Sequence, residues 1–423
     1  MRVVVTGQSG LAKRDYLEAV KTIADKHDEK LEIFSVGQRM IAEREKATGE
    51  ELNIDRILNL PYNELSLLRR LALSKIIEES KVMSNCILDT HAVFRWRNAL
   101  MPAFDIDQLH DFNPEMFVTL IDDVDNIYKR IQEKEETIWK RQTIKDIIVW
   151  REEEIAMTDV IADLINADEA KKVPHYVLTR SSDPEVLYKL MFMADQMKVY
   201  ASFPISGMGE KELKETEEFK KTLSKHFIVF DPYTITEKRV LTLGDTFADE
   251  ISGYLEDDKI DLCLKSAISK KEKTEKETRE EKPWKFPKLD AAKRALANEA
   301  TIFYPRDEEK RSVRIQDLQQ ISGNVDGQIE SRDLILIRQS NIIIVYILIE
   351  QVIRDDKLER QPHYSPGCQT ELTYAHSIGK DVYVICELPN KLSPWVTNFC
   401  TVKPFLNTRE AMEYLEKKGY IVK

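Results

Sequence analysis

Residues 365–385 read SPGCQTELTYAHSIGKDVYVI and follow an apolar run at 342–346. The apolar run is typical of a buried strand, and the glycine-containing stretch after it predicts a loop that leads into a helix of about three turns. Gly379 ends that helix, and the apolar residues that follow predict another buried strand. A strand, a helix and a second strand in this order are typical of an α/β fold with a parallel sheet.

Glu371 lies in the early part of the expected helix, and small and polar residues precede it. Open α/β sheets bind ligands beyond the carboxyl ends of their strands, where a loop leads into a helix. A carboxylate at such a junction can attack the anomeric carbon of a sugar. The stretch therefore predicts cleavage of an N-glycosidic bond. The alternative is a solvated residue on the helix surface.

The composition of the 423-residue chain restricts its class. The length favours two domains, and the formal net charge of −11 argues against a nucleic-acid partner. We expect no membrane contact, because no apolar run reaches the roughly 18 residues that a membrane span needs and the N-terminus lacks signal-peptide features. The five cysteines are scattered without a C-x-x-C pair, which favours reduced thiols in a cytoplasmic protein.

The first 194 residues alternate short apolar runs with longer, charged helical patterns. Strands are expected at 3–5, at a run ending near 35–36, and at 86–88, 116–121 and 176–178, with charged helices over 125–170 and a closing helix over 183–194. Repeated strand–helix units predict a parallel sheet with helices on both faces.

The same pattern restarts near residue 198. Further strands are expected at 198–201, 228–230, 302–303, 342–346 and 382–385. We therefore predict an α/β protein with two doubly wound parallel-sheet domains, 1–194 and 196–423, the second of flavodoxin-like or Rossmann-like type. An insert at about 265–285 is almost entirely charged, and we expect a solvated helix extension or a mobile loop there.

The first expected strand is followed by GQSGLAKR, which begins at Gly7 and precedes a helix. Backbone N–H groups at such a junction attract phosphate, and a lysine reaches the outer phosphates. The pattern G-x-x-x-x-G-K-[ST] survives at Gly7 and Lys13, with Gly10 between them. Ala12 replaces the second glycine, and Arg14 replaces the hydroxyl that would hold Mg²⁺. The loop predicts a phosphate site in which Arg14 either donates to a phosphate or closes the site. An ordinary strand–helix turn is the alternative.

Several downstream segments fit a nucleotide-binding domain. They are the Leu-Asp89-Thr-His91 segment at a strand end, the Asn-Pro-Glu segment at 113–115, the helix that contains Arg130, and the helices over 141–157. Together with the N-terminal strand and loop, they resemble the archaeal-type adenylate kinases, a branch of the P-loop nucleoside monophosphate kinases. The resemblance covers about 1–194.

This resemblance implies a domain that binds a nucleotide, with ATP and Mg²⁺ as possible ligands. It places Asp89 at a metal or phosphate site and implies that Arg130 and Arg141 are lid arginines, which neutralise charge during phosphoryl transfer. Each arginine can instead be a solvated helix charge. Because Ala12 and Arg14 interrupt the loop, a degenerate nucleotide-binding or scaffolding domain is favoured over an active kinase.

Three pieces of the second half share an order and spacing with one enzyme superfamily. They are the strand with Tyr200 and its loop Ile205-Ser206-Gly207, the Arg-Asp333-Leu segment, and the helix Gly367-x-x-x-Glu371-x-x-x-Ala375 followed by Gly379-Lys380. These pieces resemble the nucleoside 2-deoxyribosyltransferase superfamily, including its deoxynucleoside 5′-monophosphate N-glycosidase branch. The resemblance covers about 196–250 and 296–390.

The second resemblance implies Glu371 as the nucleophile and Tyr200 as the residue that orients its carboxylate. Asp333 is implied to position the sugar or to assist protonation of the leaving base. We expect Asp333 near the start of a helix, where an ordinary first-turn acid is the alternative. Members of the superfamily form dimers or hexamers whose neighbouring subunits complete the site, so a homo-oligomer is expected. The chemistry needs no metal or other cofactor.

Ser365 lies six residues before Glu371. Transferases that act on free nucleosides generally carry an aspartate there, whereas the monophosphate hydrolases carry a serine that contacts phosphate. An aspartate repels a 5′-phosphate, and a hydroxyl can donate to it, so a nucleotide is favoured over a nucleoside. The expected substrate-binding residues are Ser365, Gly367, Ile205, Ser206 and Gly207.

The favoured function is cleavage of the N-glycosidic bond of a small-molecule nucleotide or nucleoside, by hydrolysis or base transfer, with an N-terminal nucleotide-binding domain. Two alternatives remain open. One is a non-catalytic nucleotide sensor, and the other is a nucleoside monophosphate kinase with an inactive C-terminal domain.

Overall fold

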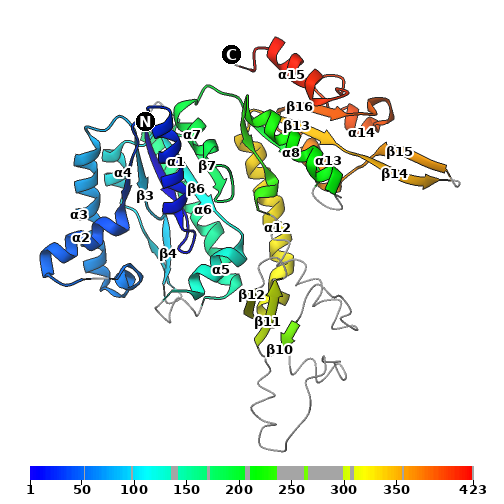
Figure 1. Ribbon diagram of the computed structural model, residues 1–423. Coiled ribbons are helices and arrows are strands. Elements are labelled where there is room, and N and C mark those ends of the chain that lie inside the picture. The colour runs from blue at the N-terminus through cyan, green and yellow to red at the C-terminus, as the bar shows by residue number, and fades with distance from the viewer. Residues whose placement is uncertain are drawn as a thin grey trace, which may run out of the picture.

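Figure 1 shows the computed structural model of the chain. It describes residues 1–51, 53–96, 99–134, 142–168, 172–204, 210–235, 262–264, 299–304, 309–354 and 357–421. The charged insert lies outside these residues, as do Arg141 and the loop residues Ile205, Ser206 and Gly207. Two parallel sheets with helices packed around them organise the described chain, which confirms the predicted α/β class.

The first sheet has five parallel strands in the order β2–β3–β1–β6–β7. These are β2 (Glu32–Ser35), β3 (Cys86–Asp89), β1 (Arg2–Thr6), β6 (Met116–Ile121) and β7 (His175–Thr179). Val3, in the central strand, pairs with Ile87 on one side and Met116 on the other. Because the chain first extends the sheet to one side of β1 and later to the other, the carboxyl end of β1 is a switch point, where α/β sheets bind ligands.

The helices of the first part form two groups. They are α1 (Lys13–Lys26), α2 (Val36–Thr48), η1 (Ile54–Asn59), α3 (Tyr62–Ser80), α4 (Ile106–Phe112), α5 (Val124–Gln132), α6 (Ile144–Asp168) and α7 (Glu185–Phe192). Helix α1 packs beside α7, whereas α4 packs against both α3 and α6. A hairpin of β4 (Val93–Trp96) and β5 (Ala99–Pro102), which the sequence did not predict, follows β3.

The second sheet has four parallel strands in the order β16–β13–β8–β9. These are β16 (Asp381–Cys386), β13 (Ile342–Ile347), β8 (Lys198–Ser202) and β9 (Ile228–Phe230). Val199 and Ala201 face one core cluster and Tyr200 faces another, so apolar residues cover both sides of β8. The helices of this part are α8 (Glu210–Ser224), α13 (Pro366–Ser377), α14 (Pro394–Thr397) and α15 (Thr408–Lys417), with η3 (Pro232–Thr234) and η4 (Pro389–Lys391).

Helix α12 (Ile315–Gln339) joins the two parts, because it packs against α6 of the first and α13 of the second (Figure 1). The Gln339 side chain exchanges two hydrogen bonds with the backbone of Val177 in β7, at 2.9 and 3.0 Å. The expectation that Asp333 lies near a helix start is wrong, because α12 begins at Ile315. Its glycines, which cost about 1 kcal/mol each, weaken the helix without ending it.

The strand expected at 302–303 also differs from the prediction. It is β11 (Glu299–Tyr304), which pairs antiparallel with β10 (Leu262–Leu264) and β12 (Glu309–Arg314) and not with the second parallel sheet. Only residues 305–308 connect β11 to β12, too few for the crossover that parallel strands need. A further hairpin of β14 (Ile349–Arg354) and β15 (Lys357–Pro362) separates β13 from α13, where no strand was predicted.

Candidate functional sites

The N-terminal loop has the strained backbone of a tight strand–helix turn. Gly7 has φ +140°, and a Cβ there would lie 2.6 Å from the carbonyl oxygen of Leu120, so only glycine fits. Ala12, immediately before α1, has φ 52° and ψ 46°, which is left-handed although alanine disfavours that region. The loop therefore keeps a left-handed turn at the position where the phosphate-loop pattern has its second glycine.

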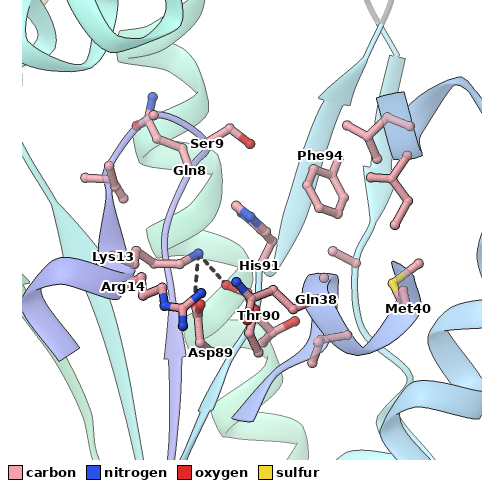
Figure 2. A pocket seen from close by; sticks show the side chains of 18 of the residues that line it. Gln8, Ser9, Lys13, Arg14, Gln38, Met40, Asp89, Thr90, His91 and Phe94 are labelled. Atoms are coloured by element: carbon pink, nitrogen blue, oxygen red, sulfur yellow. Dashed lines mark hydrogen bonds and ion pairs between the residues drawn. The ribbon is translucent and has the colours of Figure 1, made fainter. Parts of the chain in front are cut away.

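Lys13 begins α1 and points back across the loop (Figure 2). Its Nζ donates to the carbonyl oxygens of Gly7, at 2.8 Å, and Thr90, at 2.6 Å, and lies 3.5 Å from the Asp89 carboxylate. Burial raises the pKa of Asp89, and the charge of Lys13 opposes that rise. The structure therefore brings two predicted nucleotide-site residues, Lys13 and Asp89, together at the carboxyl ends of β1 and β3.

A cavity of about 290 Å³ opens beside this lysine. The loop and the segment after β3 line its polar side, which includes Ser9 and His91. Apolar side chains of α2, η1, α3 and β4 line most of the rest, together with Gln38, Arg69 and Lys134. Figure 2 shows Met40 and Phe94 on that apolar side. The combination of an anion-attracting loop and an apolar wall suits a phosphorylated ligand with an apolar or aromatic part.

Glu154 of α6 contacts His91, which lines the cavity, and was not predicted from the sequence. Its carboxylate accepts hydrogen bonds from the backbone N–H groups of Ala92 and Val93, at 2.8 and 3.0 Å, and lies 3.2 Å from His91 Nδ1. Burial raises the pKa of Glu154 to about 7, while burial and then Lys13 lower the pKa of His91 well below its usual value. Glu154 follows β3 by more than sixty residues, and no local motif marks it.

The two predicted arginines in the described residues differ in their surroundings. Arg130 donates to the Gly10 carbonyl at 3.1 Å and to the buried Asp122 carboxylate at 2.7 Å, so it contacts the loop directly. Arg14 is 62% exposed, lies 3.8 Å from Glu18 and lines the cavity. Arg130 is thus held against the loop, whereas Arg14 lies on the surface of the first helical turn.

The second candidate site centres on Glu371, in the second turn of α13. Its side chain is 8% exposed, and each carboxylate oxygen accepts a hydrogen bond from a hydroxyl of β8. Tyr200 Oη donates to Oε1 at 2.8 Å, and Ser202 Oγ donates to Oε2 at 2.6 Å. Residues two apart in a strand face the same side, which explains why both hydroxyls reach one carboxylate. Ser202 was not predicted.

Burial is the largest influence on Glu371 and raises its pKa to about 7. The Ser202 and Tyr200 hydrogen bonds lower this pKa, the charge of Asp333 raises it, and the charge of Arg332 lowers it. Burial also raises the pKa of Asp333, against the charge and hydrogen bonds of Arg332, whose Nη2 lies 2.8 Å from Asp333 Oδ1. Asp333 therefore lies in the electrostatic neighbourhood of Glu371 although it is not at a helix start.

The start of α13 contains the other described candidate residues. Ser365 is the N-cap residue, but its side chain makes no capping hydrogen bond, and Gly367 is exposed. Cys368 is buried one turn before Glu371, and burial raises the pKa of its thiol to about 12, so it is not a thiolate nucleophile. The structure thus places Ser365 and Gly367 on the same helix as Glu371.

Among the described residues, no three His, Cys, Asp or Glu side chains cluster as metal ligands would. Within the same residues, no helix is both long and apolar enough to cross a membrane.

Comparisons with known proteins give one family match. A family model described as an AAA domain matches residues 18–148, less than a third of the chain, and begins in α1 just after the loop. The match supports a P-loop nucleotide-binding domain in the N-terminal part. It does not extend to the second sheet.

No curated protein matches the chain. One solved structure, described as "Crystal structure of uncharacterized protein from Eubacterium ventriosum ATCC 27560", is 10% identical and covers 46% of this chain and 97% of its own. Its TM-score is 0.23, which carries no argument about fold or function.

Proposed function

We propose that the Glu371 centre cleaves the N-glycosidic bond of a nucleotide or nucleoside, by hydrolysis or by base transfer. The observation that carries this proposal is a buried carboxylate whose two oxygens are each held by a hydroxyl, one from Tyr200 and one from Ser202. A desolvated carboxylate in a fixed orientation is suited to attack an anomeric carbon, because little reorganisation is needed before the bond forms.

In the proposed reaction, a Glu371 oxygen forms a bond to C1′ as the bond from C1′ to the base nitrogen breaks. The electron pair of that bond leaves with the base, which accepts a proton. Asp333 is suited to supply this proton because burial raises its pKa, and Arg332 holds its carboxyl group. Water then attacks C1′ as the bond from C1′ to the Glu371 oxygen breaks, which restores the Glu371 carboxylate, and the proton lost by the water returns to the Asp333 carboxylate. In base transfer, a second base takes the place of water and its proton goes to Asp333.

The start of α13 supports a nucleotide as the substrate. Helix N-termini attract anions, and the Ser365 hydroxyl is not used as a cap. Exposed Gly367 leaves the backbone of the first turn accessible. In this proposal the 5′-phosphate binds there, and Ile205, Ser206 and Gly207, which lie outside the described residues, stay predicted substrate-binding residues.

The N-terminal cavity favours a second candidate function, which is binding of another nucleotide. Its support is the position of Lys13 and Asp89 at the switch point of the first sheet, beside an apolar wall. Binding without chemistry makes this part a sensor, whereas transfer of a phosphoryl group to a monophosphate, with ATP and Mg²⁺, makes it a kinase. Arg14 at the position of the metal-binding hydroxyl favours binding alone.

A panel of nucleosides and their 5′-mono-, di- and triphosphates tests these functions. Each is incubated with the purified chain, with and without ATP and Mg²⁺, and the products are separated by chromatography. Release of free base that disappears in Glu371→Gln supports the glycosidase, and a new nucleoside formed from an added second base identifies base transfer. Diphosphate formation that requires Lys13 identifies the kinase. Absence of free base from every compound refutes the proposed cleavage.

The domain limits 1–194 and 196–423 and the homo-oligomer also remain proposals. Light scattering of the purified chain measures the oligomeric state. A fully active monomer contradicts the oligomer.

A further inference from the structure

A continuous series of hydrogen bonds connects the N-terminal loop to α12. Arg130 donates to the Gly10 carbonyl at 3.1 Å and to Asp122 Oδ2 at 2.7 Å. The Asp122 carbonyl oxygen accepts from Arg151 Nη1 at 3.2 Å, and Arg151 Nη2 donates to Gln328 Oε1 at 2.7 Å. Arg151 belongs to α6 and Gln328 to α12, so the series crosses from the first part of the chain to the second (Figure 1).

On α12 the series reaches the Glu371 centre within one turn. Gln328 and Arg332 are four residues apart and therefore lie on the same face of the helix. Arg332 donates to Asp333 Oδ1 through Nε, at 3.1 Å, and through Nη2, at 2.8 Å. The charges of Arg332 and Asp333 both act on Glu371. A displacement of α12 at Gln328 therefore changes the surroundings of Glu371.

We propose that the N-terminal loop is an effector site, at which the phosphates of a bound nucleotide draw Arg130 away from Asp122 and thereby release α12 and slow the Glu371 centre. The proposal rests on the proposed cleavage function for its activity readout. In this proposal the nucleotide at the loop is a signal and not a substrate. Such a role fits the loop because Arg14 occupies the position where a kinase needs a metal-binding hydroxyl.

Charge balance gives the direction of the effect. Asp122 is 2% exposed, and among the described residues Arg130 is the cation paired with it. When Arg130 turns to a phosphate, the Asp122 carboxylate is left buried without that cation, which is strongly unfavourable. Arg151 already contacts the Asp122 carbonyl and is the guanidinium nearest in the series. Its move onto the carboxylate replaces a hydrogen bond to the neutral Gln328 amide with a stronger one to a charged acceptor.

The activity test measures base release from a nucleoside 5′-monophosphate with and without a non-hydrolysable ATP analogue and Mg²⁺. In the unmodified chain we expect the analogue to slow release by about five-fold or more, as coupling between two sites typically does. Gln328→Ala should be slow in both conditions, because it lacks the α12 partner of Arg151. Gln328→Glu should stay fast in both, because a carboxylate holds Arg151 on α12 more strongly.

Glu330→Ala is the matched control, because Glu330 is an exposed residue of the same helix near Gln328 and should keep the full response. An unmodified chain that releases base at one rate with and without bound analogue overturns the proposal. Gln328 variants that respond like the unmodified chain also overturn it.

A second measurement separates this inference from the cleavage function. Amide hydrogen exchange of residues 327–339 should become about five-fold faster when the analogue binds to the unmodified chain, and should not change in Lys13→Met. Unchanged exchange in the unmodified chain at saturating analogue overturns the coupling, whatever the enzyme assay shows. Faster exchange in a chain that releases no base supports the coupling and refutes the cleavage function alone.

Discussion

The N-terminal loop and the Glu371 centre each lie at the switch point of a parallel sheet, which is the carboxyl end of β1 in the first sheet and of β8 in the second. Backbone groups build the first site and side chains build the second. The loop depends on backbone shape: Ala12 adopts the left-handed conformation of the glycine it replaces, and Lys13 is held by carbonyl oxygens. At Glu371 the contacts come from side chains, the hydroxyls of Tyr200 and Ser202. A site built from backbone groups tolerates substitution, whereas a nucleophile depends on individual side chains.

The largest expected effect comes from removing the carboxylate of Glu371, the proposed nucleophile. Glu371→Gln should reduce base release at least about a thousand-fold, because an amide cannot form the glycosyl intermediate while the side-chain shape is kept. The substitution should leave nucleotide affinity at the N-terminal loop unchanged, as measured by calorimetry. Gln369→Ala, an exposed position on the same helix, is the control and should keep full activity. Comparable activity in Glu371→Gln means that another group performs the reaction.

Removing the charge of Lys13 tests nucleotide binding at the N-terminal loop. Lys13→Met should weaken binding of a nucleoside triphosphate by about ten- to a hundred-fold, because a charge-assisted hydrogen bond to phosphate is lost while the backbone N–H groups remain. Calorimetric titration measures the change, with Lys26→Met, an exposed residue at the end of the same helix, as the control. Base release without added triphosphate should stay close to normal. Unchanged affinity shows that the lysine does not reach the ligand.

Removing the Ser202 hydroxyl, which was not predicted from the sequence, should have a smaller effect on the rate of base release. The proposed cleavage needs the Glu371 carboxylate deprotonated, so the acid limb of the pH–rate profile should rise through a midpoint near its pKa of about 7. Loss of the Asp333 proton should lower the rate at higher pH. Ser202 lowers that pKa by donating to Oε2. Ser202→Ala should therefore move the midpoint to higher pH and reduce the plateau rate about ten-fold.

The pH profile distinguishes positioning from packing. Ser202→Thr retains a hydroxyl and should restore the midpoint, whereas Tyr200→Phe should shift it in the same direction as Ser202→Ala. A purely structural role for Ser202 lowers the rate without moving the midpoint. That result contradicts the assignment of Ser202 as a positioning residue.

The parallel sheets were predictable because their strands are short, continuous apolar runs. Residues 3–5 are fully buried in β1, and residues 228–230 coincide with β9. The antiparallel pairing of β11 was not predictable in this way, because an apolar run does not specify its partner. The hairpin of β14 and β15 was missed because its strands contain many charged residues, with few apolar positions to mark them.

The sites divide in the same way. Lys13 and Glu371 each lie in a local strand–loop–helix pattern that is visible in one stretch of sequence, and the role of Tyr200 was implied by the family resemblance. Ser202 and Glu154 became visible only in the folded chain, because each contacts a residue far away in sequence. The roles of all these residues remain predictions that the experiments above decide.

The smallest expected effect concerns the backbone of the loop. Ala12 has φ 52°, and a left-handed alanine costs about 1–2 kcal/mol. Ala12→Gly should remove that strain, and the greater freedom of glycine in the unfolded chain should offset part of the gain. We expect a net stabilisation of about 1 kcal/mol, measured by urea unfolding followed by tryptophan fluorescence.

Ala19→Gly is the matched control, because it makes the same substitution at a right-handed, half-buried position of α1. It should destabilise by about 1 kcal/mol, opposite in sign to Ala12→Gly. If both substitutions destabilise equally, Ala12 is not strained, and the loop has no preference for the glycine that it lacks. Opposite signs mean that Ala12 keeps its left-handed backbone although this conformation lowers the stability of the folded chain. We expect this when the function of the loop depends on its backbone conformation more than on its side chains.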